Sequence, residues 1–210
     1  MSVRIALFED ILEGGSVAMA AAAPRGVYVR SGKIAANGAA LAEDSCTLFE
    51  GPLTLSGTGE AWTWEFTPWD GGPFVEGRDR HRVIVAHEIA IDPKKPVLLR
   101  ADRVDFPPDI VTPKHGHAGA GIRRLLHGRL LAEIGDRAFR VGPGEAWYES
   151  GTEPVVGNNI APSSGFVRMI ALPPGHLGIT SFTPWTPEEG TKPRGVNYRL
   201  FFDTVVTIPG

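Results

Sequence analysis

The chain has 210 residues, with 21 basic residues against 24 acidic ones and a formal net charge of −3. This balance gives no electrostatic reason to expect binding to nucleic acid or to an anionic membrane. The 26 glycines and 18 prolines are typical of short strands joined by tight turns, so we expect little helix. A single cysteine, Cys46, excludes an intrachain disulfide framework and fits a reducing compartment.

An alanine-rich run at residues 16–23 is the one stretch that resembles part of a signal peptide. It follows Glu9, Asp10 and Glu13 instead of a basic segment, so we do not interpret it as one. No apolar stretch approaches the roughly 18 residues that a membrane-spanning helix needs. We therefore expect a cytoplasmic protein with no membrane partner.

The first part of the chain is predicted to form short strands. They are expected at 2–8, 27–30, 39–42, 46–49, 52–55 and 61–66, with a turn at 9–14. Residues 17–23 suit a helix or a strand, and the flanking glycines and proline favour a short strand. Next we expect a covering loop at 67–77, a strand at 78–92 and a turn at 93–96, after which residues 97–106 lead into a segment with two histidines.

Segments 27–66 and 124–172 share one order of features, which indicates a weak internal repeat. In each, a strand ends in a glycine turn, a short aromatic strand ends in Glu and Gly, and a final strand closes the set. We predict two related halves, at 1–72 and 97–174, joined by a connecting loop and strand at 73–96. An irregular tail at 175–210 is expected to end in a strand that packs back on the second half, although pairing with the first half or a partner subunit stays open.

Two histidines in the second half are the main candidates for metal chemistry. His115 and His117 are two residues apart, so on a strand they share a face and can converge on one ion or ligand. The alternative is two polar residues on a loop that bind nothing. A catalytic metal usually needs a third protein ligand, for which Glu149, at the end of a predicted strand, is a candidate. Glu149 could equally be an ordinary strand-end charge.

This region resembles the conserved barrel of the cupin superfamily. His115, His117 and Gly128 match the first cupin motif, and Gly144, Gly151 and Asn158 match the second. Two positions differ, because Gly121 or Ile122 stands where the family has a glutamate ligand and Pro154 where it has another histidine. The resemblance implies an all-β cupin-type double-stranded β-helix, or jelly-roll barrel, with half of the usual metal site.

The resemblance also suggests residues that contact a substrate. Arg123 would face the cavity and hold a carboxylate, but a shift of one residue would turn it toward water, so both orientations stay open. Trp147 and Tyr148 alternate in direction, and we take Trp147 as the cavity residue. Asn158 is a candidate for substrate binding or for structural hydrogen bonds near its turn.

The resemblance implies a protein that acts on small molecules. The first hypothesis is a metal-dependent dioxygenase, isomerase or lyase that uses Fe, Mn, Ni or Zn on a small carboxylate or aromatic compound. The alternative is a non-catalytic metabolite-binding or sensory protein with little or no metal, which the two missing ligands favour. A storage or scaffold role is disfavoured by the low amide content. We expect no nucleotide or flavin cofactor and no nucleic-acid partner, and we expect a homodimer.

Overall fold

A computed structural model describes residues 2–19, 23–69 and 81–209. The chain divides into two compact units, Met1–Val97 with Val206–Gly210, and Leu98–Val205. Within the described residues the helices are η1 (Pro174–His176) and α1 (Pro187–Gly190), so the predicted low helix content is confirmed. Neither is long and apolar enough to cross a membrane.

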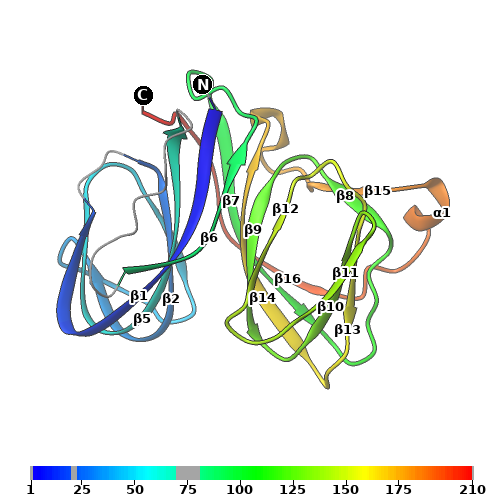
Figure 1. Cartoon of the computed structure of the whole chain (residues 1–210), viewed down its shortest axis with the longest axis horizontal. Helices are drawn as coiled ribbons and strands as arrows, with labels where there is room; N and C mark the ends of the chain where they lie inside the picture. The colour runs from blue at the N-terminus through cyan, green and yellow to red at the C-terminus, as the bar shows by residue number, and fades with distance from the viewer. Residues whose placement is uncertain (1, 20–22, 70–80, 210) are drawn as a thin grey trace. The chain divides into compact units, whose positions relative to one another are not determined.

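The first unit contains one antiparallel sheet in the order β3-β2-β5-β1-β6, with β4 paired to β2 (Figure 1). Its strands are β1 (Ser2–Met19), β2 (Arg25–Ala36), β3 (Ala39–Leu41), β4 (Cys46–Phe49), β5 (Leu53–Trp69) and β6 (His81–Ile89). Alternate side chains of the long strands point to one face, where Leu12, Val27 and Leu55 belong to an apolar core. His81 and His87 both lie on β6, in this unit.

Two expectations for the first unit were wrong. The turn expected at 9–14 is absent, because β1 runs through it and takes up the extra residues as an irregular register between Glu13 and Ser16. The strands expected at 52–55 and 61–66 are one strand, β5. Gly57 and Gly59 let β5 approach β2 closely, since a Cβ at either would lie 2.1 Å from a β2 carbonyl oxygen. Of the loop expected at 67–77, residues 70–77 lie outside the described residues, as do 20–22 and 78–80.

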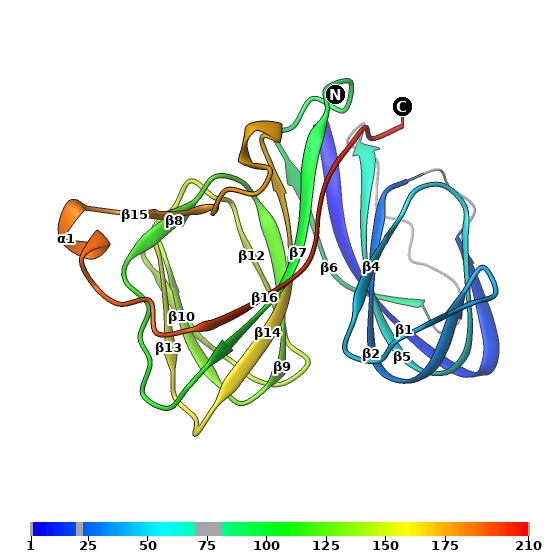
Figure 2. The same cartoon turned by 180° about the vertical axis from the view of Figure 1, so that it is seen from behind.

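The second unit is a sandwich of two five-stranded antiparallel sheets, in the orders β12-β9-β14-β7-β16 and β11-β10-β13-β8-β15 (Figures 1 and 2). The strands of the first sheet are β7 (Val97–Phe106), β9 (Gly121–His127), β12 (Ala146–Glu149), β14 (Ser164–Leu172) and β16 (Asn197–Val206). Those of the second are β8 (His115–His117), β10 (Leu130–Ile134), β11 (Arg137–Val141), β13 (Val155–Asn159) and β15 (Phe182–Pro184). Apolar residues of both sheets, such as Phe166 and Leu130, form one core. The predicted all-β jelly roll is confirmed.

A covering segment, residues 173–196, connects β14 to β16 and contains β15. It adds β15 to the edge of one sheet, where Phe182 pairs with His117. Arg100 of β7 holds the start of this segment, because its guanidinium donates to the carbonyl oxygens of His176 at 2.8 Å and Ile179 at 2.9 Å. The segment that the sequence predicted to be irregular is therefore tied to the sandwich at several points.

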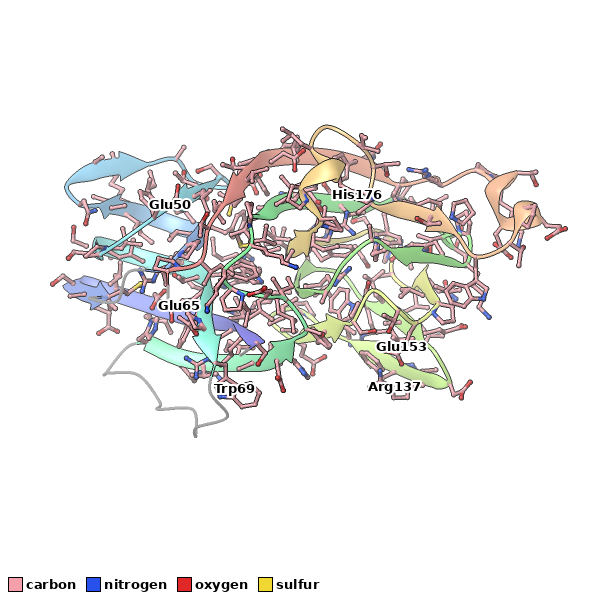
Figure 3. The ribbon with its side chains drawn as sticks, turned by 90° about the horizontal axis from the view of Figure 1, so that it is seen from above. Glu50, Glu65, Trp69, Arg137, Glu153 and His176 are labelled. Atoms are coloured by element: carbon pink, nitrogen blue, oxygen red, sulfur yellow. The ribbon has the colours of Figure 1, made fainter. Side chains whose placement is uncertain are left out.

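Charged residues of the second unit fall into two groups. Some form exposed surface pairs, such as Arg137 and Glu153 at 3.3 Å, which Figure 3 shows near one another. Others are buried in the sandwich: Arg100, Asp102, Arg123, Arg124, Glu149 and Arg168. Because an unpaired charge in a protein interior is costly, a buried group of charges marks a candidate functional site.

Candidate functional site

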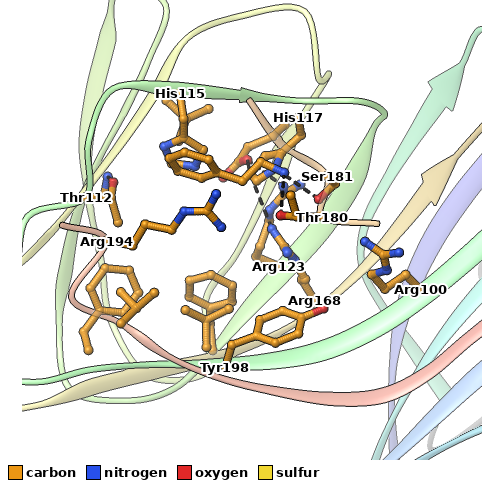
Figure 4. Close-up of a pocket in the computed structure, with 18 of the residues that line it drawn as sticks. Arg100, Thr112, His115, His117, Arg123, Arg168, Thr180, Ser181, Arg194 and Tyr198 are labelled. Atoms are coloured by element: carbon orange, nitrogen blue, oxygen red, sulfur yellow. Dashed lines mark hydrogen bonds and ion pairs between the residues drawn. The ribbon is translucent and has the colours of Figure 1, made fainter. Parts of the chain in front are cut away.

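A cavity of about 500 Å³ lies inside the second unit, a size that suits a small organic ligand (Figure 4). Its lining combines an apolar part with a polar part. The apolar part includes Val104, Phe106, Leu130, Ala132, Trp147, Val155 and Phe166, and the polar part Arg100, His115, His117, Arg123, Glu149, Arg168, Arg194 and Asp203.

A row of side chains across one sheet supplies much of the polar part. In this row each residue is the cross-strand partner of the next, in the order Trp147 on β12, Arg123 on β9, Arg168 on β14 and Asp102 on β7. Two guanidinium groups therefore stand directly opposite each other, an arrangement that like charges disfavour. The row is stable only if anions lie close to both arginines.

Two buried carboxylates supply those anions. Asp102 accepts from Arg168 Nε at 2.8 Å and from the Tyr198 hydroxyl at 3.1 Å. Glu149 Oε2 lies 2.6 Å from Arg123 Nη2, in an ion pair that is not aligned as a hydrogen bond. The other oxygen of Glu149 accepts from Trp147 Nε1 at 2.9 Å. Each arginine of the row thus has its own anion.

The two histidines approach this row from the opposite sheet. Their rings are 4.9 Å apart and nearly perpendicular. His115 Nδ1 donates to the Pro113 carbonyl oxygen at 2.7 Å, and its ring stacks on Phe182. His117 Nε2 lies 3.4 Å from Glu149 Oε2 and accepts from Arg168 Nη1 at 3.4 Å.

Burial and the neighbouring charges determine the protonation of these groups. Burial lowers the pKa of His115 below its ordinary value of 6.5, and burial with the charges of Arg168 and Arg123 lowers the pKa of His117 well below it. Burial also lowers the pKa of Arg123 to about 10, although Glu149 opposes the change. At neutral pH both imidazoles are therefore uncharged and Arg123 keeps its charge.

These shifts predict that the protein loses stability in mild acid. Between pH 6.5 and the lower folded-state pKa values, the unfolded chain binds protons on His115 and His117 that the folded chain excludes. The free energy of unfolding should therefore fall as the pH drops from 7, by up to about 1.4 kcal/mol per pH unit for each histidine. Urea unfolding of wild type and His117→Gln at several pH values checks this. The variant should show a shallower slope, and a slope equal to that of wild type would contradict the assignment to His117.

The structure brings together most of the residues singled out in the sequence. His115, His117, Arg123, Trp147 and Glu149 all line the cavity, and of the two orientations left open for Arg123 the inward one is found. Asn158 is not among the lining residues. Its neighbour Asn159 is the buried amide, which donates to the Pro107 carbonyl oxygen at 2.7 Å and accepts from Ser164 Oγ at 2.6 Å.

Sequence reasoning missed four charged residues that line the cavity, Arg100, Arg168, Arg194 and Asp203, and also Asp102, which pairs with Arg168. Arg168 interrupts the apolar run FVRMIAL, and a lone charge in an apolar strand is a signal that could have identified it. Asp102 is one of four charged residues at 97–106, and no pattern distinguishes it from the others. Arg194 lies in the segment that was expected to be irregular, and no pattern indicated that it would reach the cavity.

The donor set does not fit the metal ion that the cupin resemblance implies. No group of three or more His, Cys, Asp or Glu side chains in the described part of the chain is arranged to hold an ion. The His117 Nε2 lone pair accepts an N–H from Arg168, and Glu149, the candidate third ligand, is paired with Arg123. Coordination would have to break both contacts.

Solved structures similar to this chain agree on its fold. AerE from Microcystis aeruginosa aligns with a TM-score of 0.54 at 11% identity, over 82% of this chain and 89% of its own. A cupin 2 conserved barrel domain protein from Leptotrichia buccalis aligns with a TM-score of 0.50 at 13% identity, over 80% of this chain and 83% of its own. A mutant salicylate 1,2-dioxygenase from Pseudoaminobacter salicylatoxidans aligns with a TM-score of 0.52 at 9% identity, over 80% of this chain and 71% of its own. No family model matches the sequence, and no curated protein resembles it significantly.

Proposed function

The chain has the cupin fold, and we propose that its cavity binds a small organic carboxylate with an apolar body. The apolar part of the lining, which includes Trp147, Phe106 and Phe166, would hold the body of the ligand. A cavity of about 500 Å³ has room for an aromatic acid of this kind. Binding is proposed to need no metal ion, since the polar part of the cavity carries fixed cations of its own.

The observation that carries this proposal is the charge of Arg194. Among the described residues four arginines line the cavity, and three are paired with carboxylates: Arg100 with Asp203 at 2.9 Å, Arg123 with Glu149 at 2.6 Å and Arg168 with Asp102 at 2.8 Å. Arg194 pairs with no carboxylate of the described chain.

The position of Arg194 suits a ligand contact. Its guanidinium lies 3.9 Å from the centre of the Phe182 ring, which itself stacks on His115. Figure 4 shows the side chain extending into the cavity from the covering segment. A guanidinium held on an aromatic ring keeps its N–H edge available and can bind a carboxylate with two hydrogen bonds. In this proposal Arg194, instead of Arg123, receives the carboxylate, because Arg123 already has an anion.

Replacement of Arg194 tests the proposal. Calorimetric titration of wild type in EDTA with benzoate, salicylate and cinnamate should identify a carboxylate that binds. Arg194→Gln should then weaken the binding of that carboxylate by about tenfold to a hundredfold, which is the effect of losing a charge-assisted hydrogen bond. Binding of the matching neutral amide should change little.

Lys192→Gln is the matched control, because it removes a cation of the same segment that is paired with Glu189 and is outside the cavity lining. If both variants weaken carboxylate binding equally, the effect comes from the overall charge of the segment and not from a contact with Arg194. An unchanged carboxylate affinity in Arg194→Gln would refute the assigned contact.

The metal-dependent dioxygenase, isomerase or lyase expected from the sequence stays a prediction. One contact supports it: the bond from His115 Nδ1 to the Pro113 carbonyl fixes the tautomer that leaves Nε2 unprotonated, as metal-binding histidines require. The contacts of His117 and Glu149 oppose it. Metal analysis of the purified protein, compared with a His115→Ala, His117→Ala double variant, distinguishes the two functions.

A further inference from the structure

We infer that Arg123 is a built-in replacement for a metal ion: its guanidinium supplies to Glu149 the positive charge that a divalent cation would otherwise bring. This role concerns the polar end of the cavity and does not depend on which ligand the cavity binds.

The contacts of Arg123 hold its charge in one place. The residue is completely buried, and its Nη1 donates to the Gly121 carbonyl oxygen at 2.7 Å. Its Nη2 lies 2.6 Å from Glu149 Oε2, the same oxygen that lies 3.4 Å from His117 Nε2. The guanidinium therefore pairs with the carboxylate that a metal shared by Glu149 and His117 would have to use.

The second arginine of the row, Arg168, occupies the other potential metal ligand, His117. Arg168 Nη1 donates to His117 Nε2, and Arg168 is held in turn by Asp102. A divalent ion placed between His117 and Glu149 would add two positive charges beside two buried guanidinium groups. Their repulsion is strong because little water is present to screen it. The arginines thus satisfy the two potential ligands and also repel a competing ion.

The cupin glutamate cannot be supplied from its usual place to offset this repulsion. Of the two positions that match it, Gly121 shares the face of β9 with the cavity residue Arg123, and a Cβ at Gly121 would lie 2.3 Å from the Met169 carbonyl oxygen of the neighbouring strand. The acid instead comes from Glu149, the cross-strand partner of Gly121, and it arrives already paired with Arg123. The fixed cation and the displaced acid are therefore parts of one arrangement.

Removal of the guanidinium should create a metal site. In Arg123→Met, Glu149 loses its paired cation and one of the two guanidinium charges beside it is gone, so Zn²⁺ should bind about a hundredfold more tightly than to wild type in calorimetric titration. Zn²⁺ should also raise the melting temperature of the variant and not that of wild type. A second substitution, Glu149→Gln, should abolish the gain.

Arg124→Met is the matched control, since it removes a buried arginine from the next position of β9 that does not line the cavity. It should leave the Zn²⁺ affinity at the wild-type value. An Arg123→Met protein that binds Zn²⁺ no better than wild type would overturn the inference.

A comparison that does not need Arg123→Met gives a second test, which decides the matter if that variant does not fold. After dialysis against Zn²⁺, wild type and the His115→Ala, His117→Ala variant should retain the same amount of metal. If wild type retains stoichiometric metal and the double variant retains none, the inference that Arg123 replaces the metal ion is refuted. Carboxylate binding through Arg194 is measured in EDTA and would be unaffected by either result.

Discussion

Asp102→Asn is expected to lower the free energy of unfolding by about 3–5 kcal/mol, the usual cost of removing one partner of a buried ion pair. Asp102 is completely buried and accepts from Arg168 at 2.8 Å and from Tyr198. Without the carboxylate charge, Arg168 stands opposite Arg123 with no anion of its own. Urea unfolding followed by tryptophan fluorescence measures the change.

An ion pair on the same strand provides the control for this prediction. Arg103 and Asp105 are also 2.8 Å apart, but their side chains are 22% and 33% exposed. Asp105→Asn should therefore cost less than about 1 kcal/mol, because water already solvates both groups. Similar losses in the two variants would mean that the charge balance of the row is not what stabilises the sheet.

Gly121→Glu, which puts a glutamate at one of the two positions that match the cupin ligand, is expected to destabilise the second unit instead of restoring a metal site. The added Cβ would lie 2.3 Å from Met169 O and 2.8 Å from the Ile170 Cα, both backbone atoms of β14 that cannot move without breaking strand pairing. The expected loss is about 3 kcal/mol or more, at the upper end of overpacking effects. Thermal unfolding by circular dichroism measures it, and Gly121→Ala should already show a large part of the loss.

Gly142→Ala is the comparison for this change. A Cβ at Gly142 meets only the flexible side chain of Glu145, at 3.5 Å, so the expected change in stability is within about 0.5 kcal/mol. A Gly121→Glu protein as stable as wild type would show that β9 and β14 can separate. The position would then be open to a ligand after all.

Strand positions were predictable where the local signals agreed. The strand at 46–49 has the predicted ends, because turn residues flank a clear β pattern. Prediction was wrong at 9–14, where acidic residues and glycines suggested a turn. Pairing of β1 with both β5 and β6 outweighs that local preference, and the strand accommodates the glycines as an irregularity.

For the site, too, local spacing was predictable and long-range contacts were not. The spacing of His115 and His117 placed both rings on the cavity side, because side-chain direction alternates along a strand. Motif spacing indicated Asn158, whereas the structure buries its neighbour Asn159. Arg168 and Asp102 lie more than sixty residues apart in the chain, and no periodicity relates them.

By itself, the sequence determined the all-β class and the shared direction of the two histidines, because strand periodicity and turn residues act over a few neighbours, whereas the jelly roll was implied by the cupin resemblance. Only the tertiary structure decided the charge state of the cavity. Cross-strand register places Arg123 opposite Arg168, and the fold brings Glu149, Asp102 and Arg194 to them from separate strands and from the covering segment. Charges interact through space, at distances that the order of residues does not encode, so the pairing of these groups appears only once the sheets are assembled.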